Sequence, residues 1–333
     1  MTASDRLLAI VRAFGGRRIV VIGDVIADEF IYGQIARVSR EAPVLILNYD
    51  STEIVAGGAG NAASNAAALG AAASAVGVVG RDESGRRLLA SMRRRRIDVR
   101  RMLTPSGYRT PTKTRILAGG IHSAKQQVVR IDRAASASPD ERTRELFEDR
   151  VLTAAAACDA LLVSDYGSGL VTPSLVAAAR DRMQVPVVLV DSRYDLLRYK
   201  GLTACTPNES EVEQALGVRI GDDPRALERA GRTVLTRTRS RAVLVTRGSR
   251  GMALFQPGVR TIHIPIVGSD QIADVTGAGD TVIATMTLAL SAGATFEEAA
   301  HLANHAGGIV VMKRGTASVT AAELRVSIAE RPE

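Results

Sequence analysis

The sequence has few aromatic residues and little cysteine. The chain of 333 residues contains no Trp, 5 Phe and 6 Tyr, although 46% of its residues are hydrophobic. The core must therefore be aliphatic, and a nucleic-acid surface built on stacked aromatic rings is disfavoured. Cys158 and Cys205 lie far apart and fit neither a disulfide framework nor a zinc module. This cysteine usage suits a reducing compartment, and we expect a cytoplasmic protein.

A membrane-spanning segment is not expected either. Charged residues interrupt positions 1–20, which argues against a secretory leader. The uncharged stretch 54–80 is long enough to span a bilayer, but it consists mainly of Ala and Gly, with Asn61 and Asn65 among them. Such a segment gains little in lipid and packs closely inside a protein. The sequence therefore predicts a buried segment and no membrane partner.

Acidic residues are outnumbered by basic ones. The chain has 35 Asp and Glu against 43 Lys and Arg, which gives a net charge of +8, and four consecutive arginines occupy positions 93–96. Because no nucleic-acid-binding motif accompanies them, we interpret this run as an exposed helix face and expect no nucleic-acid partner. Nucleic-acid binding is kept as an alternative. The same positive field would attract an acidic small-molecule substrate.

Strand and helix patterns alternate along most of the chain. Strands are predicted at 18–22, 44–49, 72–79, 113–117, 125–131, 160–164, 187–190, 203–206, 242–246, 252–255 and 261–264. Helices are predicted at 59–69, 83–95, 140–157, from 172, from 208, at 224–237 and in three C-terminal segments, the last two opened by capping boxes. This order predicts an α/β fold with a doubly wound, mainly parallel sheet flanked by helices.

Two segments, about 30–55 and 107–132, interrupt the alternation. Both are rich in strand patterns and lack helices, and Gly119-Gly120 predicts a hairpin within the second. We expect them to pair as a small second sheet beside the main one. No linker divides the chain, so we expect residues 1–333 to form a single domain with these two insertions.

The stretch Asp274-Val-Thr-Gly-Ala-Gly-Asp280 is followed directly by a hydrophobic run that predicts a helix. Gly277 and Gly279 allow a sharp turn, and the free N–H groups at a helix start attract anions such as phosphate. Asp280 falls in the first helical turn, where a carboxylate is an ordinary cap. Beside a phosphate it would be repelled unless it takes the proton of an attacking hydroxyl. We interpret Asp280 as a general base, with capping as the alternative.

Two common nucleotide-binding motifs do not account for this stretch. The pattern Gly-x-x-x-x-Gly-Lys-Ser/Thr is absent from the sequence. Residues 58–63 fit the dinucleotide fingerprint loosely, but they do not directly follow the first predicted strand. A dinucleotide-dependent oxidoreductase is therefore the weaker alternative.

Four segments together resemble the ribokinase-like (PfkB) carbohydrate kinases. In chain order they are Gly57-Gly58-Ala-Gly-Asn61, Asn208-Glu-Ser-Glu211, Thr246-Arg-Gly-Ser-Arg-Gly251 and Asp274-Val-Thr-Gly-Ala-Gly-Asp280. They occur in the order found in that family and cover nearly the entire chain. The resemblance implies a ribokinase-like fold and ATP-dependent transfer of a phosphoryl group to a sugar hydroxyl.

Further segments are similar to the heptose 7-phosphate kinases within that family. These segments are 23–28, 32–33, 37–44, 111–115, 125–132 and 164–169. Three positions depart from the usual pattern, with Arg40 in place of a proline, Ser168 in place of a lysine and Val275 in place of a threonine. No nucleotidyltransferase domain follows, so we expect the kinase activity alone and not a bifunctional protein.

The resemblance implies roles around the acceptor. Asp28 and Asn61 would hold sugar hydroxyls, and the residues that let the sugar lie close to backbone would be Gly57 and Gly58. Asp280 would be the general base, and charge on the moving phosphoryl group would be stabilised by the N–H groups of Gly277, Ala278 and Gly279. Three cations of the second insertion would bind the distal phosphate of a sugar phosphate, or else lie on an exposed strand face: Lys113, Arg115 and Arg130.

The resemblance also implies a nucleotide site and two kinds of cation. The nucleotide-side residues would be Asn208, Glu211, Thr246, Gly248, Gly251 and Asn304, the last near the adenine. Asn208 and Glu211 would organise Mg²⁺-bound phosphates through water, whereas without the resemblance they are interpreted as a helix cap and a solvated acid. Asp274 and the Val275 carbonyl would belong to a loop for a monovalent cation such as K⁺.

The sequence thus predicts an ATP- and Mg²⁺-dependent sugar kinase. The favoured acceptor is the anomeric hydroxyl of a heptose 7-phosphate, which would give the 1,7-bisphosphate. The alternative within the same class is another sugar, sugar phosphate or nucleoside. The two insertions would form a lid over the sugar and the contact of a homodimer.

Overall fold

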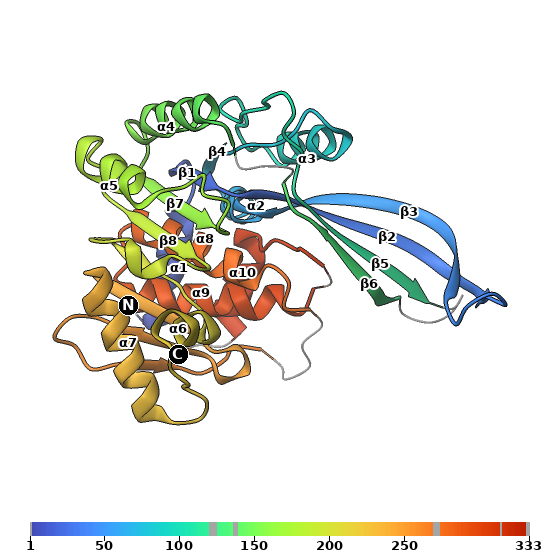
Figure 1. The fold of residues 1–333 in the computed structure, drawn as a ribbon. Helices are drawn as coiled ribbons and strands as arrows, with labels where there is room; N and C mark the ends of the chain where they lie inside the picture. The colour runs from blue at the N-terminus through green and yellow to red at the C-terminus, as the bar shows by residue number, and fades with distance from the viewer. Residues whose placement is uncertain (1, 120–124, 136–138, 269–273, 314, 331–333) are drawn as a thin grey trace.

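The structure is a computed structural model, and it describes residues 2–119, 125–135, 139–268, 274–313 and 315–330 (Figure 1). Eight strands form the main sheet, in the order β12-β11-β10-β9-β8-β7-β1-β4. Their bounds are β1 Arg18–Gly23, β4 Ala72–Val76, β7 Ala160–Asp165, β8 Val188–Ser192, β9 Ala204–Cys205, β10 Ala242–Thr246, β11 Met252–Phe255 and β12 Ile262–Ile264. In this order, neighbouring strands from β10 to β4 pair in parallel, whereas the pairs β10–β11 and β11–β12 are antiparallel. The predicted mainly parallel sheet is confirmed.

Helices cover both faces of this sheet because its strands are apolar on both sides. Along β1, Ile19 and Val21 belong to one buried cluster, and Val20 and Ile22 to a second. The first cluster also takes residues from α1 Ala3–Arg12, α2 Ala59–Ala68, α3 Glu83–Arg94, α8 Ala278–Ser291, α9 Phe296–Val310 and α10 Ala321–Glu330. The second takes residues from α4 Glu141–Ala155, α5 Pro173–Arg182, α6 Glu209–Leu216 and α7 Pro224–Thr238. The doubly wound architecture follows from this alternation.

The predicted helix starts are found where the capping residues lie. Thr172 accepts a hydrogen bond from the N–H of Leu175 at the start of α5, and Thr295 forms a capping box with Glu298 at α9. Helix α1, which the sequence analysis did not predict, also begins with a capping box, formed by Thr2 and Asp5.

The two insertions pair as a four-stranded sheet, which we call the small sheet, in the order β3-β2-β5-β6. Its strands are β2 Val25–Val38, β3 Leu45–Gly58, β5 Thr112–Gly119 and β6 Gln126–Arg133. The sheet extends from the body as a long arm (Figure 1). The prediction of a second sheet is confirmed, but β2 begins and β3 ends nearer the body than the range 30–55. Of the predicted Gly119-Gly120 turn, Gly120 lies outside the described residues.

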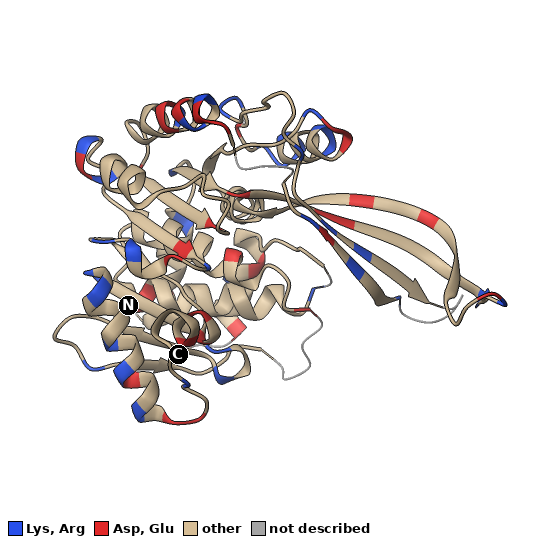
Figure 2. Cartoon of the chain, viewed as in Figure 1, with Lys and Arg blue, Asp and Glu red and all other residues tan. Residues whose placement is uncertain are grey.

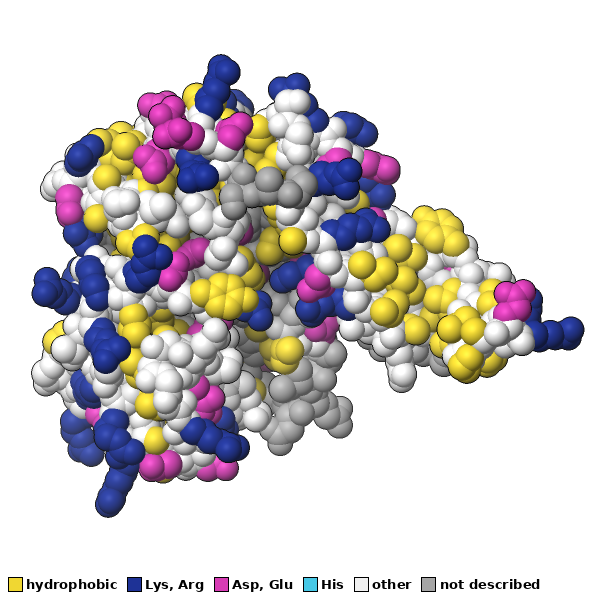
Figure 3. Space-filling view, viewed as in Figure 1, with side chains coloured by type: hydrophobic (Ala, Val, Ile, Leu, Met, Phe, Trp, Pro, Cys, Tyr) yellow, Lys and Arg dark blue, Asp and Glu magenta, His cyan; other side chains and the backbone are white. Residues whose placement is uncertain are grey.

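The surface differs between the body and the arm. Charged residues of both signs are dispersed over the helices of the body (Figure 2). Hydrophobic side chains gather on the arm (Figure 3), and those exposed there are Ile35, Val38, Val44, Leu45, Tyr49, Val128, Val129 and Ile131. In the part of the chain that the structure describes, no helix is long and apolar enough to cross a bilayer.

Candidate active site

The start of helix α8 places Asp280 at the centre of the site. Gly277 precedes the helix with φ +79°, in the left-handed region that favours glycine. A Cβ on Gly277 would also lie only 2.4 Å from the side-chain nitrogen of Asn61. Both constraints require glycine, and the resulting turn puts Asp280 in the first turn of α8.

The Asp280 carboxylate is buried, with 4% of the residue exposed. The Asn61 Nδ2 group donates a hydrogen bond of 2.9 Å to its Oδ2, and the Tyr166 hydroxyl donates one of 3.4 Å to its Oδ1. Burial raises the pKa of the Asp280 carboxyl to about 7. A carboxylate in this state can accept a proton near neutral pH.

Asn61 comes from the first turn of helix α2 and is itself held in place. The Asn65 Nδ2 group donates to Asn61 Oδ1 over 3.2 Å, one helical turn further on. This bond leaves the Asn61 Nδ2 group facing Asp280. The glycine segment before α2 and the motif before α8 therefore meet at the Asn61–Asp280 hydrogen bond.

Asp28 lies on β2 beside the same glycine segment. Its carboxylate accepts a hydrogen bond of 2.6 Å from Arg115 Nη1 and one of 3.0 Å from the Thr316 hydroxyl. The Arg115–Asp28 ion pair is buried, with side-chain exposures of 10% and 7%. A Cβ on Gly57 would lie 2.4 Å from Asp28 Oδ2, so only glycine allows this approach.

The three predicted phosphate-binding cations lie in different surroundings. Lys113 is the neighbour of Asp28 across the β2–β5 pair, and its Nζ lies 5.2 Å from the ring centroid of Tyr166. Arg115 forms the buried ion pair with Asp28. Arg130 lies on the exposed strand β6 and pairs with Asp132 at 2.8 Å, where both side chains are about half exposed (50% and 48%). The structure therefore brings Lys113 and Arg115 to the site and places Arg130 on the arm.

Asp280 also lines an acidic cavity of about 270 Å³. Its polar lining residues are Asp165, Tyr166, Asp191, Arg193, Thr206, Asn208, Ser210, Glu211, Gln214, Thr246 and Asp280. Burial raises the pKa of Asp191 well above its usual range, and the charge of Glu211 raises it further. Burial also raises the pKa of Glu211. Carboxylates gathered in this way favour a cation, and oxygen ligands suit Mg²⁺.

Asn208 and Glu211 do act as a helix cap. Asn208 Oδ1 accepts from the Glu211 N–H, and Glu211 Oε2 accepts from the Asn208 N–H, each over 2.9 Å. The capping box also fixes both side chains at the wall of the acidic cavity. The structural and the functional interpretations of this motif are therefore compatible.

A second, more apolar cavity of about 290 Å³ adjoins the acidic one. Asn208, Thr246 and Gly279 line both cavities. The remaining lining residues of the apolar cavity are Gly248, Gly251, Met252, Ile266, Val275, Ala278, Val282, Asn304, Gly307, Gly308 and Val311. Asn304 donates to the Pro265 carbonyl over 2.7 Å. An apolar hollow that adjoins a polar one suits a nucleotide, with the adenine ring in the apolar hollow and the phosphates in the polar one.

Comparison with known proteins decides the family. The model of the pfkB family carbohydrate kinases matches residues 17–322. The chain belongs to the pfkB family of carbohydrate kinases. It is therefore a phosphotransferase that acts on an alcohol group of a sugar.

Curated relatives match almost the whole chain. The bifunctional protein HldE of Desulfatibacillum aliphaticivorans is 38% identical over 325 residues, which cover 97% of this chain and 65% of that protein. The bifunctional protein HldE of Geobacter sulfurreducens is 40% identical over 316 residues, covering 93% of this chain and 62% of that protein. The chain thus spans just under two thirds of the length of these relatives. The expectation of a kinase activity alone stays a prediction.

Solved structures share the fold. Arabidopsis thaliana ribokinase, complexed with ribose and ATP, has a TM-score of 0.69 at 21% identity, covering 95% of this chain and 98% of that one. Escherichia coli phosphofructokinase-2, in complex with potassium, has a TM-score of 0.74 at 18% identity, with coverages of 95% and 99%. These likenesses confirm the ribokinase-like fold.

In this pfkB family kinase, the predicted cation loop precedes α8. The Asp274 carboxylate accepts from the N–H groups of Thr276 and Gly315, over 2.9 and 3.0 Å. The Val275 side chain is 63% exposed, and its carbonyl accepts from the Ala278 N–H over 3.3 Å. The departure at Val275 therefore changes a largely exposed residue at the border of the apolar cavity.

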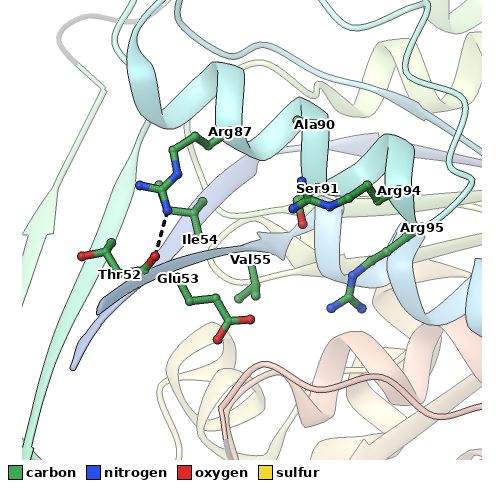
Figure 4. A pocket seen from close by; sticks show the side chains of 9 residues that line it. All are labelled: Thr52, Glu53, Ile54, Val55, Arg87, Ala90, Ser91, Arg94 and Arg95. Carbon is green, nitrogen blue, oxygen red and sulfur yellow. Dashed lines mark hydrogen bonds between the residues drawn. The ribbon is translucent and has the colours of Figure 1, made fainter. Parts of the chain in front are cut away.

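The arginine run 93–96 lies at the end of α3. Arg94 and Arg95 line a hollow of about 460 Å³ between α3 and β3, which Figure 4 shows from close by. Arg87, one of the other lining residues, donates to the Thr52 carbonyl over 2.9 Å and connects α3 to the small sheet (Figure 4). Arg95 donates to the Ser318 hydroxyl over 3.2 Å and connects the end of α3 to the segment before α10.

The sequence analysis gave no role to several polar residues of the site, among them Asp165, Tyr166 and Asp191. Asp165 ends β7, Tyr166 follows it, and Asp191 lies near the end of β8. In a parallel sheet these ends meet at one edge, where ligands bind. The signal was therefore present as polar residues that close buried strand patterns.

Proposed function

We propose that this kinase transfers the γ-phosphoryl group of ATP to the anomeric hydroxyl of a heptose 7-phosphate. The product would be the 1,7-bisphosphate. The observation that carries the proposal is the buried Asp280 carboxylate, at a glycine turn between the Asp28–Asn61 cluster and the two adjoining cavities. The heptose assignment is supported by the sequence segments similar to heptose 7-phosphate kinases.

Asp280 serves as the general base. It takes the proton of the acceptor hydroxyl while the hydroxyl oxygen bonds to the γ-phosphorus and the bond from that phosphorus to the β–γ bridging oxygen breaks. ADP leaves with the bridging oxygen, and Asp280 later returns the proton to water. The pKa of about 7 makes the carboxylate a stronger base than an exposed aspartate.

The turn before α8 stabilises charge on the moving group. Gly277, Ala278 and Gly279 contribute N–H groups at the helix start, where the helix dipole also favours an anion. These groups are fixed by the backbone, so they need no rearrangement during the reaction.

ATP occupies the two adjoining cavities. Asn304, Gly248 and Gly251 line the apolar hollow that would hold the adenine end, and Thr246 lies where the two cavities join. Asp191 and Glu211 fit a Mg²⁺ ion, because they are carboxylates whose pKa values burial raises and which face one polar cavity. Bound Mg²⁺ would offset the charge of the phosphates, with Asn208 orienting Glu211.

The acceptor lies against Asp28, Asn61 and the backbone at Gly57 and Gly58. Arg115 holds the Asp28 carboxylate in place through the buried ion pair. Lys113 is the cation nearest to this cluster and would bind the distal phosphate. Arg130 would join it when the arm bends over the sugar.

The arm also supports a homodimer and the cation loop supports K⁺. Strands β2, β3 and β6 of the arm each carry exposed apolar side chains, and exposed apolar surface of this kind favours an interface. A second copy of the chain would cover this surface and close the site. Asp274 and the Val275 carbonyl would take part in a K⁺ site beside the start of α8.

An acceptor panel tests the proposal. Heptose 7-phosphate, the unphosphorylated heptose, ribose, fructose 6-phosphate and a nucleoside are each incubated with ATP and Mg²⁺, and ADP release and the product are followed. We expect the highest kcat/KM with heptose 7-phosphate and a product phosphorylated at the anomeric position. Preference for ribose or a nucleoside would overturn the acceptor assignment and leave the sugar kinase class intact.

A further inference from the structure

Tyr166 contacts the reaction centre and has no role in the account so far. It lies directly after β7, inside the segment 164–169 that the sequence analysis noted without assigning a function. Its hydroxyl donates to Asp280 Oδ1 over 3.4 Å, while Asn61 donates to Oδ2 over 2.9 Å. Each oxygen of the carboxylate thus has its own donor.

The Tyr166 hydroxyl keeps its proton in this position. The negative charge of Asp280 raises the pKa of Tyr166 well above its ordinary value, and burial raises it further. A phenol that stays protonated can only support the carboxylate as a donor, and it cannot replace Asp280 as the base.

Three contacts fix the place of the ring. The Tyr166 N–H donates to Asp24 Oδ2 over 2.7 Å, which ties the backbone to the end of β1. The ring carbon Cε2 lies 3.4 Å from the position that a Cβ on Gly58 would take, so the ring packs close to the Gly58 backbone. Lys113 lies over the ring at 5.2 Å from its centroid. Tyr166 is therefore positioned by the end of β1, the end of β3 and β5 together.

Tyr166 borders two hollows. It lines the acidic cavity of about 270 Å³ and a cavity of about 360 Å³ that Asp24, Tyr108 and Ser168 also line. A change of the Tyr166 χ1 rotamer would move the ring into one of these hollows and take its hydroxyl away from Asp280. The backbone bond to Asp24 and the contact with Lys113 oppose that change.

We propose that Tyr166 is a positioning residue that fixes the plane of the Asp280 carboxylate for proton transfer. The inference rests on the proposed function of Asp280 as the base. With two donors, on Oδ1 and Oδ2, the carboxylate has one orientation, and a free lone pair faces the acceptor hydroxyl. With Asn61 alone, the carboxylate can turn about its Cβ–Cγ bond, and fewer encounters have the required geometry.

The test compares Tyr166→Phe with Tyr166→Ala. Tyr166→Phe keeps the ring, its contact at Gly58 and its place under Lys113, and removes only the hydroxyl. We expect kcat to fall roughly tenfold or more with Tyr166→Phe, while KM for the acceptor stays within about twofold. Tyr166→Ala, which also removes the wall, should lower kcat and raise KM. A wild-type kcat in Tyr166→Phe would overturn the proposal, as would a raised KM alone.

Tyr199→Phe is a matched control for stability. The Tyr199 hydroxyl is buried and donates to another carboxylate, Asp165, over 2.8 Å. Thermal unfolding of the two Phe variants then shows what the loss of such a bond does to Tm. If Tyr166→Phe loses no more Tm than Tyr199→Phe but loses kcat, instability is not the cause.

Crystal structures of the variants give a readout that needs no acceptor. We expect the Asp280 carboxylate to be rotated or divided between orientations in Tyr166→Phe and single in Tyr199→Phe. A single, unrotated carboxylate in Tyr166→Phe would contradict the proposal even if no acceptor were found. Absence of ATP-dependent sugar phosphorylation by the wild-type chain would instead count against the proposed function, so the two failures are distinguishable.

Discussion

At the scale of single residues, the account depends on the protonation of Asp280. Its pKa of about 7 results mainly from burial, and the hydrogen bonds from Asn61 and Tyr166 act in the opposite direction. A base must be ionised to accept a proton, so the active form predominates above this pKa and is lost as the pH falls below it. The activity of the enzyme should therefore report directly on this carboxyl group.

The pH dependence of kcat/KM provides the first prediction. We expect kcat/KM to be level above pH 7 and to fall by about tenfold per pH unit below it, with an apparent pKa of about 7. Steady-state rates across this range, at a fixed excess of Mg²⁺, measure the profile. A limb near 3.8, the ordinary value for an aspartate, would contradict the assignment.

The residues of the site were predictable only in part. Asp280, Gly277 and Asn61 were found because each belongs to a short motif whose chemistry is local. The partnership of Asp28 with Arg115 could not be found this way, because it depends on the register of β2 against β5. Tyr166 and Asp191 meet Asp280 only through the order of strands in the main sheet.

At the scale of elements, the start of α8 has the strictest requirement. Gly277 has positive φ, and a Cβ there would lie 2.4 Å from Asn61 Nδ2, so a side chain would be strained and would also displace the donor to Asp280. Gly293 has a similar φ of +87°, and nothing lies within 4 Å of the position of its Cβ. A comparison of substitutions at these two glycines therefore distinguishes backbone strain, which both share, from displacement of Asn61, which only Gly277 would cause.

Alanine at each glycine gives the second prediction. Both Gly277→Ala and Gly293→Ala should lower the free energy of unfolding by about 1–2 kcal/mol, because each places Ala in a left-handed conformation. Only Gly277→Ala should also lower kcat, by at least about tenfold, because Asn61 must move. Denaturant unfolding and steady-state kinetics measure the two effects. Equal kcat in the two variants would show that the turn does not control the site.

The elements themselves were largely predictable because their signals are local. Capping residues predicted where helices of the body begin, and short apolar runs predicted its strands. The small sheet was expected as a unit, but its boundaries were not, because Gly57 and Gly58 continue β3 into the glycine segment. Helix α1 was not predicted, because its capping box pairs Thr2 with Asp5 and lacks the Glu or Gln of the usual signature.

At the scale of the whole molecule, the arm exposes apolar side chains to solvent. Val129 and Ile131 lie two residues apart on β6, so their side chains share one face of the small sheet, and each is 43% exposed. The burial of such a face in a second copy would stabilise a dimer through the hydrophobic effect. The sequence predicted that the two insertions pair, but it did not give the register of β2 against β5 or the face that stays exposed, because both depend on contacts between distant segments.

The third prediction concerns this face. The wild-type chain should be a dimer, and the double variant Val129→Lys, Ile131→Lys should be a monomer with a raised KM for the acceptor, because the arm would no longer be held over the sugar. Light scattering coupled to size exclusion measures the mass. Val326→Lys is a control at a 55% exposed position on α10. A wild-type monomer, or a dimer that the double variant leaves intact, would refute the proposed contact.

The most direct test of the central claim is the rate of phosphoryl transfer in Asp280→Asn. Asparagine keeps the size of the side chain and removes the base, so we expect kcat to fall by roughly a thousandfold or more, with ATP affinity by calorimetry within about threefold of the wild type. A variant that binds ATP normally and transfers phosphate at a rate near that of the wild type would contradict the account.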